Sequence, residues 1–118
     1  MSRMSKSYKD FPSWIKTVEL IKVVYEITSS WPESEKFGLT NQIRRAAVSI
    51  ASNIAEGYGR YDAGDKRHFL SIARGSTYEV EAQLILSREL GFTKDVTTVL
   101  EMTQEVCALL HAAREAVR

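Results

Sequence analysis

The stretch QIRRAAVSIASNIAEGYGR, residues 42–60, has an apolar and a polar pattern that both repeat every three or four residues. This spacing predicts an amphipathic helix, because residues three and four apart lie on one helix face. Apolar positions from Leu39 to Tyr58 cover an arc of roughly 180–200°, about twice what one neighbouring helix needs. We therefore expect this helix to contact both its own bundle and another molecule. Gly57 and Gly59 should end it, since glycine adopts the left-handed conformation of a C-terminal cap.

Three further segments have helical periodicity. Ser13 and Thr93 are the expected N-caps of the first and last helices, because their hydroxyls can accept from early helix N–H groups. Asp62 or Asp65 should cap the third helix, and Gly91 should end it. The predicted helices span residues 13–30, 39–58, 65–90 and 94–117. With short connections, these helices predict an all-α fold: one domain over residues 1–118, built as an antiparallel up-down-up-down four-helix bundle.

The composition is that of an ordinary globular domain. The chain has 118 residues, of which 44% are hydrophobic and 26% charged, and its net charge is +1. A protein that binds only through phosphate contacts is usually more basic. The N-terminal stretch MSRMSKSYKDFPSW lacks the apolar core of a signal peptide, and no apolar run approaches the roughly 20 residues of a membrane span. We therefore expect a cytoplasmic protein.

The sequence contains no recognisable catalytic or metal-binding motif. Its two histidines, His68 and His111, lie on different predicted helices, and its one cysteine, Cys107, cannot complete a zinc site with them. Asp65 near His68 is better interpreted as a helix cap than as a metal ligand. Cys107 lies among apolar residues of a helix, which favours a buried, inert thiol. We expect neither an enzyme nor a bound metal or cofactor.

One carboxylate interrupts an apolar row of the third predicted helix. Glu79 lies seven residues from both Ile72 and Leu86. It is either a boundary residue whose carboxylate reaches water, or a buried carboxylate paired with Arg44 or Arg45. We favour the pair, in a structural role, because an ionised carboxylate is rarely buried without a partner. The expected structural polar network consists of Arg44, Asn53, Glu56 and Glu79, with Asn53 and Glu56 forming hydrogen bonds within or between subunits.

The remaining cations of the second and third predicted helices form a candidate docking surface. Residues 44–61 contain three arginines against one glutamate, so the second helix has a basic excess. A row spaced by seven along the third helix consists of Arg67, Arg74, Glu81 and Arg88. These polar rows are either a solvated face or a surface that docks nucleic acid or protein. The candidate contact residues are Arg45, Arg60, Lys66, Arg67 and Arg74.

Four stretches together resemble a bacterial family of four-helix-bundle proteins encoded in intervening sequences of large-subunit ribosomal RNA genes. They are FPSWIKTVELIKVVYEIT (residues 11–28), WPESEKFGLT (31–40), QIRRAAVSIASNIAEGYGR (42–60) and HFLSIARGSTYEVEAQL (68–84), and SNIAEG and ARGS-x-x-E are the most specific motifs. The resemblance implies a homo-oligomeric ring, with five subunits as the expected number. It also points to a related accessory variability protein of diversity-generating retroelements, which works with a reverse transcriptase and RNA. That relative has a strongly basic surface, from which the net charge of +1 departs.

Two hypotheses of function follow. In the first, a non-enzymatic homo-oligomer binds structured RNA or an RNA–protein complex through its arginines. In the alternative, the protein is an adaptor or scaffold that binds another protein and no nucleic acid. The near-neutral charge and the mixed-sign polar rows suit this second hypothesis.

Overall fold

The structure is a computed structural model that describes residues 7–118. The beginnings of the N-terminal stretch and of the predicted domain therefore lie outside the described residues. Four α-helices make up most of the chain, namely α1 (Pro12–Thr28), α2 (Leu39–Tyr58), α3 (Ala63–Glu89) and α4 (Thr97–Glu115). Two short 3-10 helices, η1 (Tyr8–Asp10) and η2 (Glu33–Glu35), precede α1 and α2. No strand occurs among residues 7–118, so the prediction of an all-α fold with four helices is confirmed.

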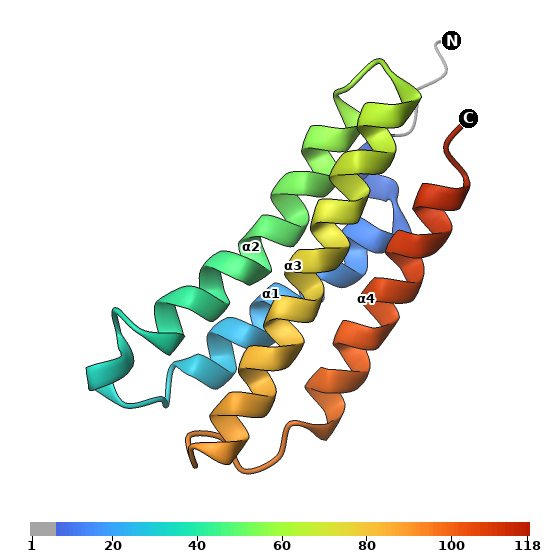
Figure 1. The fold of residues 1–118 in the computed structure, drawn as a ribbon. Coiled ribbons are helices and arrows are strands. Elements are labelled where there is room, and N and C mark those ends of the chain that lie inside the picture. The colour runs from blue at the N-terminus through green and yellow to red at the C-terminus, as the bar shows by residue number, and fades with distance from the viewer. Residues whose placement is uncertain (1–6) are drawn as a thin grey trace, which may run out of the picture.

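The four helices lie side by side along the length of the molecule, and the described part of the chain begins and ends at the same end of it (Figure 1). Each helix packs against two others, because α2 and α4 each contact both α1 and α3. Aliphatic side chains of all four helices fill the space between them, and the largest of those that are fully buried include Leu20, Ile43, Ile50, Ile54, Leu84 and Leu110.

The wide apolar arc of α2 is buried within its own chain. Ile43, Ile50 and Ile54 are almost fully buried, while Val48 and Tyr58 at the arc's edges remain 42% exposed. We expected part of this arc to contact another molecule. Its burial within the chain removes the need for such a contact, which stays a prediction. A helix in a four-helix bundle has two neighbours, here α1 and α3, and together they account for a double-width arc.

Of the two glycines after SNIAE, Gly59 ends α2 as its C-cap, as predicted, while Gly57 has a different role. Gly57 lies inside α2, and Gly59 has a right-handed conformation with φ −77°, so neither forms a left-handed cap. A Cβ atom on Gly57 would lie 3.2 Å from Phe69 Cβ and 3.3 Å from the Lys66 carbonyl oxygen. Gly57 therefore permits close contact between the end of α2 and the start of α3. Gly91, with φ +80°, has the left-handed conformation expected after α3.

Two of the predicted N-caps are wrong. Ser13 lies within the first turn of α1 and is buried, because Pro12 takes the first helical position and Phe11 the N-cap. α4 begins at Thr97, after Val96, rather than after Thr93. For α3, in contrast, the Asp62 side chain accepts a hydrogen bond from the Asp65 N–H, as a capping residue should.

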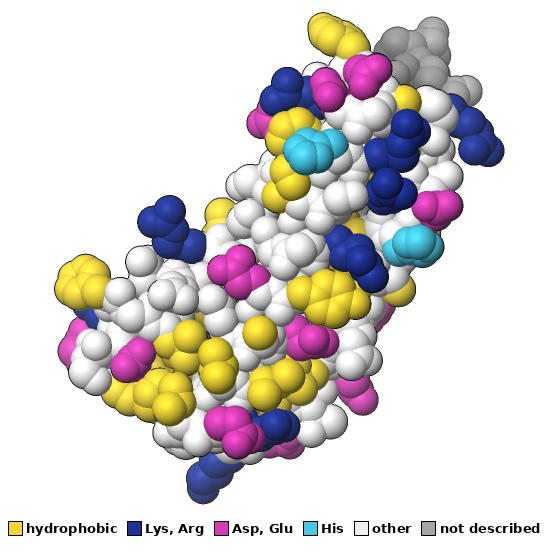
Figure 2. All heavy atoms as spheres, viewed as in Figure 1, with side chains coloured by type: hydrophobic (Ala, Val, Ile, Leu, Met, Phe, Trp, Pro, Cys, Tyr) yellow, Lys and Arg dark blue, Asp and Glu magenta, His cyan; other side chains and the backbone are white. Residues whose placement is uncertain are grey.

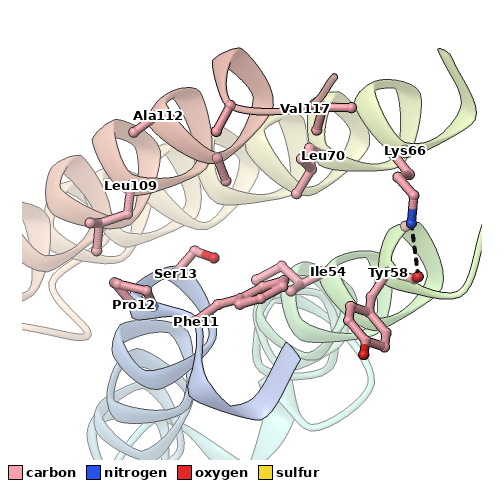
Figure 3. A pocket seen from close by; sticks show the side chains of 13 residues that line it. Phe11, Pro12, Ser13, Ile54, Tyr58, Lys66, Leu70, Leu109, Ala112 and Val117 are labelled. Atoms are coloured by element: carbon pink, nitrogen blue, oxygen red, sulfur yellow. Dashed lines mark hydrogen bonds between the residues drawn. The ribbon is translucent and has the colours of Figure 1, made fainter. Parts of the chain in front are cut away.

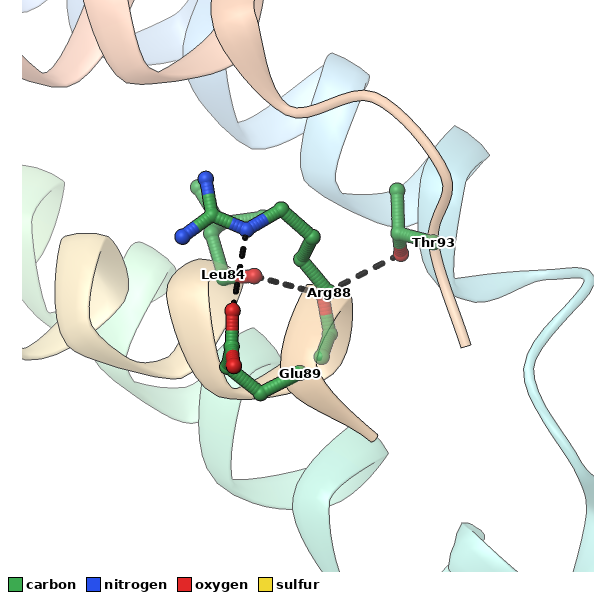
Figure 4. A network of polar contacts seen from close by, with 5 residues as sticks. Leu84, Arg88, Glu89 and Thr93 are labelled. Carbon is green, nitrogen blue, oxygen red and sulfur yellow. Dashed lines mark hydrogen bonds and ion pairs between the residues drawn. The ribbon is translucent and has the colours of Figure 1, made fainter. Parts of the chain in front are cut away.

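Thr93 instead joins the two loops at the far end of the bundle. The buried Trp31, between α1 and η2, donates from Nε1 to Thr93 Oγ1 at 2.8 Å. Ser87 Oγ donates to the Leu84 carbonyl at 2.7 Å and lies 3.1 Å from the same Thr93 hydroxyl (Figure 4). A hydroxyl that faces an indole N–H and a serine is satisfied by tertiary contacts and so is not available to cap a helix.

Gly57 and Gly59 allow a matched test of the α2–α3 contact. We expect Gly57→Ala to lower the free energy of unfolding by about 1–2 kcal/mol, because its Cβ would press on the Lys66 backbone despite the better helix propensity of alanine. Gly59→Ala should be neutral or stabilise by up to about 1 kcal/mol, since its Cβ would meet only ordinary contacts at 3.6 Å and beyond. Urea titrations of both variants check this. Equal effects of the two substitutions would contradict it.

Candidate nucleic-acid interface

Basic side chains gather at the end of the bundle that holds the α2–α3 turn and the end of α4. Figure 2 shows several Lys and Arg side chains over the upper part of α3 and α4, and hydrophobic side chains over the lower part of the same face. The predicted docking residues belong partly to this region. Arg60, Lys66 and Arg67 lie at or near the α2–α3 turn, and Arg74 lies about two turns further along α3.

Arg45 is not part of this surface. It lies 15 residues before Arg60, mostly along α2, which corresponds to roughly 20 Å along a helix axis. It lines a shallow depression together with Gln42, Ser49 and Glu79. The predicted set of five cations therefore does not form one patch, because sequence periodicity places residues on a helix face without separating them along its length.

Two of the candidate cations are held by local contacts of the α2–α3 turn. Arg60 forms an ion pair with Glu56 at 2.8 Å, and its guanidinium lies 4.7 Å from the centre of the Phe69 ring. Lys66 Nζ donates to the Tyr58 carbonyl at 3.1 Å. These contacts fix the turn. An exposed pair one helical turn apart contributes only about 0.2–0.5 kcal/mol, so Arg60 stays accessible to a partner.

Three other arginines form what we call the basic cluster, namely Arg67, Arg74 and Arg114. Arg67 and Arg74 have no carboxylate within 4.0 Å among residues 7–118. Ser71 lies between them on α3, and Arg114 of α4 donates from Nε to its hydroxyl at 3.0 Å. Arg74 lies over the Tyr78 ring, 5.2 Å from its centre. The cluster thus brings together arginines from two helices, one of which, Arg74, lies beside an exposed aromatic ring.

Arg114 was not predicted from the sequence. Its distance from Arg67 in the chain is large, and only the packing of α4 on α3 brings the two together. A basic residue in the last turn of α4 is by itself an ordinary helix C-terminal feature. No sequence signal distinguishes it from a residue with that role.

The expected polar network is a set of separate contacts. Arg44 Nε donates to Thr28 Oγ1 at 2.8 Å, and the guanidinium lies 4.5 Å from the Tyr25 ring centre. Asn53 donates to the Ser49 carbonyl one turn earlier at 2.8 Å. The Ser49 hydroxyl, in turn, lies 3.0 Å from that of Ser76, which links α2 to α3.

The predicted buried pair of Glu79 is wrong. Glu79 is exposed and has no ion pair within the described chain. The apolar row that contains it faces outward, because Ile72 is 37% and Leu86 50% exposed, while Val80 next to Glu79 faces the core. The interpretation of a carboxylate that reaches water therefore applies. Heptad spacing alone did not distinguish an inner row of α3 from an outer one.

Cys107 and the possible metal ligands are the groups among the described residues that bear on catalytic chemistry. No group of three or more His, Cys, Asp or Glu side chains among them could hold a metal ion. Burial raises the pKa of the half-buried Cys107 thiol above its ordinary value, and the nearby Arg74 only partly opposes this. A raised pKa means less thiolate at neutral pH and hence a poor nucleophile. Within residues 7–118, no helix is both long and apolar enough to cross a membrane.

Cys107 should therefore react slowly with a thiol-specific aromatic disulfide. At about pH 8 we expect the folded protein to react at least tenfold more slowly than the urea-unfolded protein, because both burial and the raised pKa reduce accessible thiolate. The rate should reach half its maximum at a higher pH in the folded state than in the unfolded state. Spectrophotometry of the released thiolate measures both. A faster reaction of the folded protein would show an activated cysteine.

Comparison with known proteins adds one finding to this geometry. The model of a family described as 23S rRNA-intervening sequence protein matches residues 9–112, which include all four helices except the last residues of α4. A comparison with curated proteins gave no match.

Proposed function

The chain belongs to the family of 23S rRNA-intervening sequence proteins, and from that premise we propose that it is a non-enzymatic homo-oligomer that binds structured RNA or an RNA–protein complex. The observation that carries this proposal is the basic cluster, in which Arg67 and Arg74 have no acidic partner among the described residues. An arginine without a carboxylate partner can offer its donors to phosphate oxygens in a bidentate manner.

The surroundings of the cluster suit RNA. Tyr78 is 47% exposed beside Arg74, and an exposed aromatic ring can stack on an unpaired base. The chain as a whole has a net charge of only +1, so a single copy would bind phosphates weakly. In a symmetric oligomer the cluster would be repeated in every subunit, and the weak contacts of the individual subunits with one RNA would together give a higher affinity.

The proposed oligomer is a ring of antiparallel up-down-up-down bundles, with five subunits as the expected number. Because most of the arc of α2 is buried within the chain, we place the interface on the outer row of α3. Its exposed residues recur at steps of three and four, as in the seam of a coiled coil, with small residues between larger ones. This outer seam comprises Ile72, Gly75, Glu79, Ala82, Leu86 and Leu90.

Light scattering tests the ring. At micromolar concentration the mass should be several times that of the 13.4 kDa chain. Leu86→Glu should reduce it, because a charge would be placed in the seam. Ile15→Glu is the matched control on α1, since Ile15 is 49% exposed and Leu86 50%, and it should leave the mass unchanged. A monomeric wild-type protein, or equal effects of both variants, would contradict the seam as the interface.

The RNA-binding proposal is tested by removing the two unpaired charges. Arg67→Gln/Arg74→Gln should weaken binding to a structured ribosomal RNA fragment. The slope of log Kd against log salt should fall by about 0.7–0.9 for each phosphate that the variant no longer neutralises. Lys22→Gln/Arg88→Gln removes the same charge away from the cluster and should change binding little. Filter binding at several salt concentrations, with light scattering of each variant, makes the comparison.

The alternative is a protein–protein adaptor or scaffold that does not bind nucleic acid. The large exposed hydrophobic side chains favour it, among them Phe37 at 87% and Tyr61 at 102% exposure. Wild-type protein that binds no structured RNA at low salt, or a cluster variant that binds as well as the wild type, would support this adaptor function in place of the first.

A further inference from the structure

A cavity of about 420 Å³ opens between the start of α1 and the end of α4, at the end of the bundle that holds the α2–α3 turn. Figure 3 shows Phe11, Pro12 and Ser13 on one side of it, and Leu109, Ala112 and Val117 on the other. Nearly all lining side chains are aliphatic or aromatic. The size is within the range of roughly 300–1,000 Å³ found for small-molecule sites.

One polar group points into this apolar space. Ser13 is only 1% exposed, and its Oγ has no hydrogen-bond partner among residues 7–118. In Figure 3 this hydroxyl points from α1 toward the opposite wall. Thr17, one turn further along α1, is fully buried and its hydroxyl likewise lacks a partner in the described chain. A buried hydroxyl without a partner destabilises a fold, so its retention calls for an explanation.

The same place is the N-terminus of a long helix. α1 has 17 residues and no side-chain cap, because its N-cap is Phe11. Pro12 has no N–H, so the first free backbone donors of the helix belong to Ser13 and Trp14. These donors and the helix dipole attract a negative group. The positive end of α1 and the unpartnered Ser13 hydroxyl are two independent features that favour the same kind of ligand atom, an anionic oxygen.

We propose that the cavity binds an amphipathic carboxylic acid of the medium-chain fatty acid class. Its carboxylate would accept from the Ser13 hydroxyl and the first N–H groups of α1. Its chain would lie against the apolar wall formed by Ile54, Leu70 and Leu109. Lys66, the cationic side chain of the lining, adds positive potential on the opposite side, where it is held at the Tyr58 carbonyl.

The number of donors favours a carboxylate over a phosphate. The head group would be almost completely buried at Ser13, where one hydroxyl and the first-turn N–H groups are the available donors. Those donors can satisfy a flat, singly charged group with two oxygens. A phosphate dianion has three acceptor oxygens and more charge, and would be left with unsatisfied oxygens in an apolar site. None of the three arginines of the basic cluster lines the cavity, so a ligand held there does not use the contacts of the proposed RNA binding.

Calorimetric titration of the full-length protein with decanoate tests the proposal. We expect saturable binding of one decanoate per chain. Ala113→Phe would fill the cavity and should weaken binding by about tenfold or more. Ala108→Phe is its control, because Ala108 is an exposed residue of the same helix that does not line the cavity, and it should bind decanoate like the wild type.

Ser13→Ala tests the head group. It should weaken decanoate binding by roughly tenfold while it leaves the binding of 1-decanol, which has no charge, nearly unchanged. Its urea midpoint should equal or exceed that of the wild type, because the substitution removes an unsatisfied hydroxyl. Absence of saturable decanoate binding at millimolar concentration would overturn the proposal. So would equal binding by Ala113→Phe, or a lowered midpoint for Ser13→Ala, which would indicate that the hydroxyl serves the fold through an ordered water instead.

Discussion

Close packing of α2 on α3 is the contact on which the rest of the molecule depends, and it is the most extensive of the helix contacts. It is possible because small residues of α2 face α3. Gly57 lies against Phe69 and the Lys66 backbone at one end, and the hydroxyls of Ser49 and Ser76 meet at 3.0 Å further along. Larger side chains at these positions would separate the helices, and the turn that holds Arg60 and Lys66 would move with them.

This packing determines what α3 exposes. With α2 on one flank and α4 on the other, α3 has an outward strip that no other part of the described chain covers. The strip separates into two chemically different parts, because the outer seam is mostly apolar while Arg67 and Arg74 follow the flank next to α4. One helix thus presents an apolar strip and a basic strip to its surroundings, and the two do not overlap.

The sequence predicted most of the fold and only part of the site. Helical periodicity located all four helices, and the predicted ends differ from the observed ones by up to three residues. The largest difference is at the start of α4, because the Thr93 hydroxyl expected to cap it binds Trp31 instead. Periodicity could not decide whether the row containing Glu79 faced inward, since that depends on which side of α3 meets its neighbours. The sequence did not indicate Arg114 for the same reason, because only the packing of α4 on α3 brings it next to the other arginines of the basic cluster.

The hydrogen bond between Trp31 and Thr93 makes the two ends of the bundle differ in how firmly α1 and α4 are held together. At the loop end, it ties the segment after α1 to the segment before α4. At the opposite end, the cavity lies where α1 and α4 would otherwise fill the space between them. Local opening in native proteins starts where packing is sparse and ends where it is dense. The boundary between α1 and α4 should therefore open from the cavity end toward Trp31, and backbone amides of the last turns of α4 should exchange with solvent before those of its first turns.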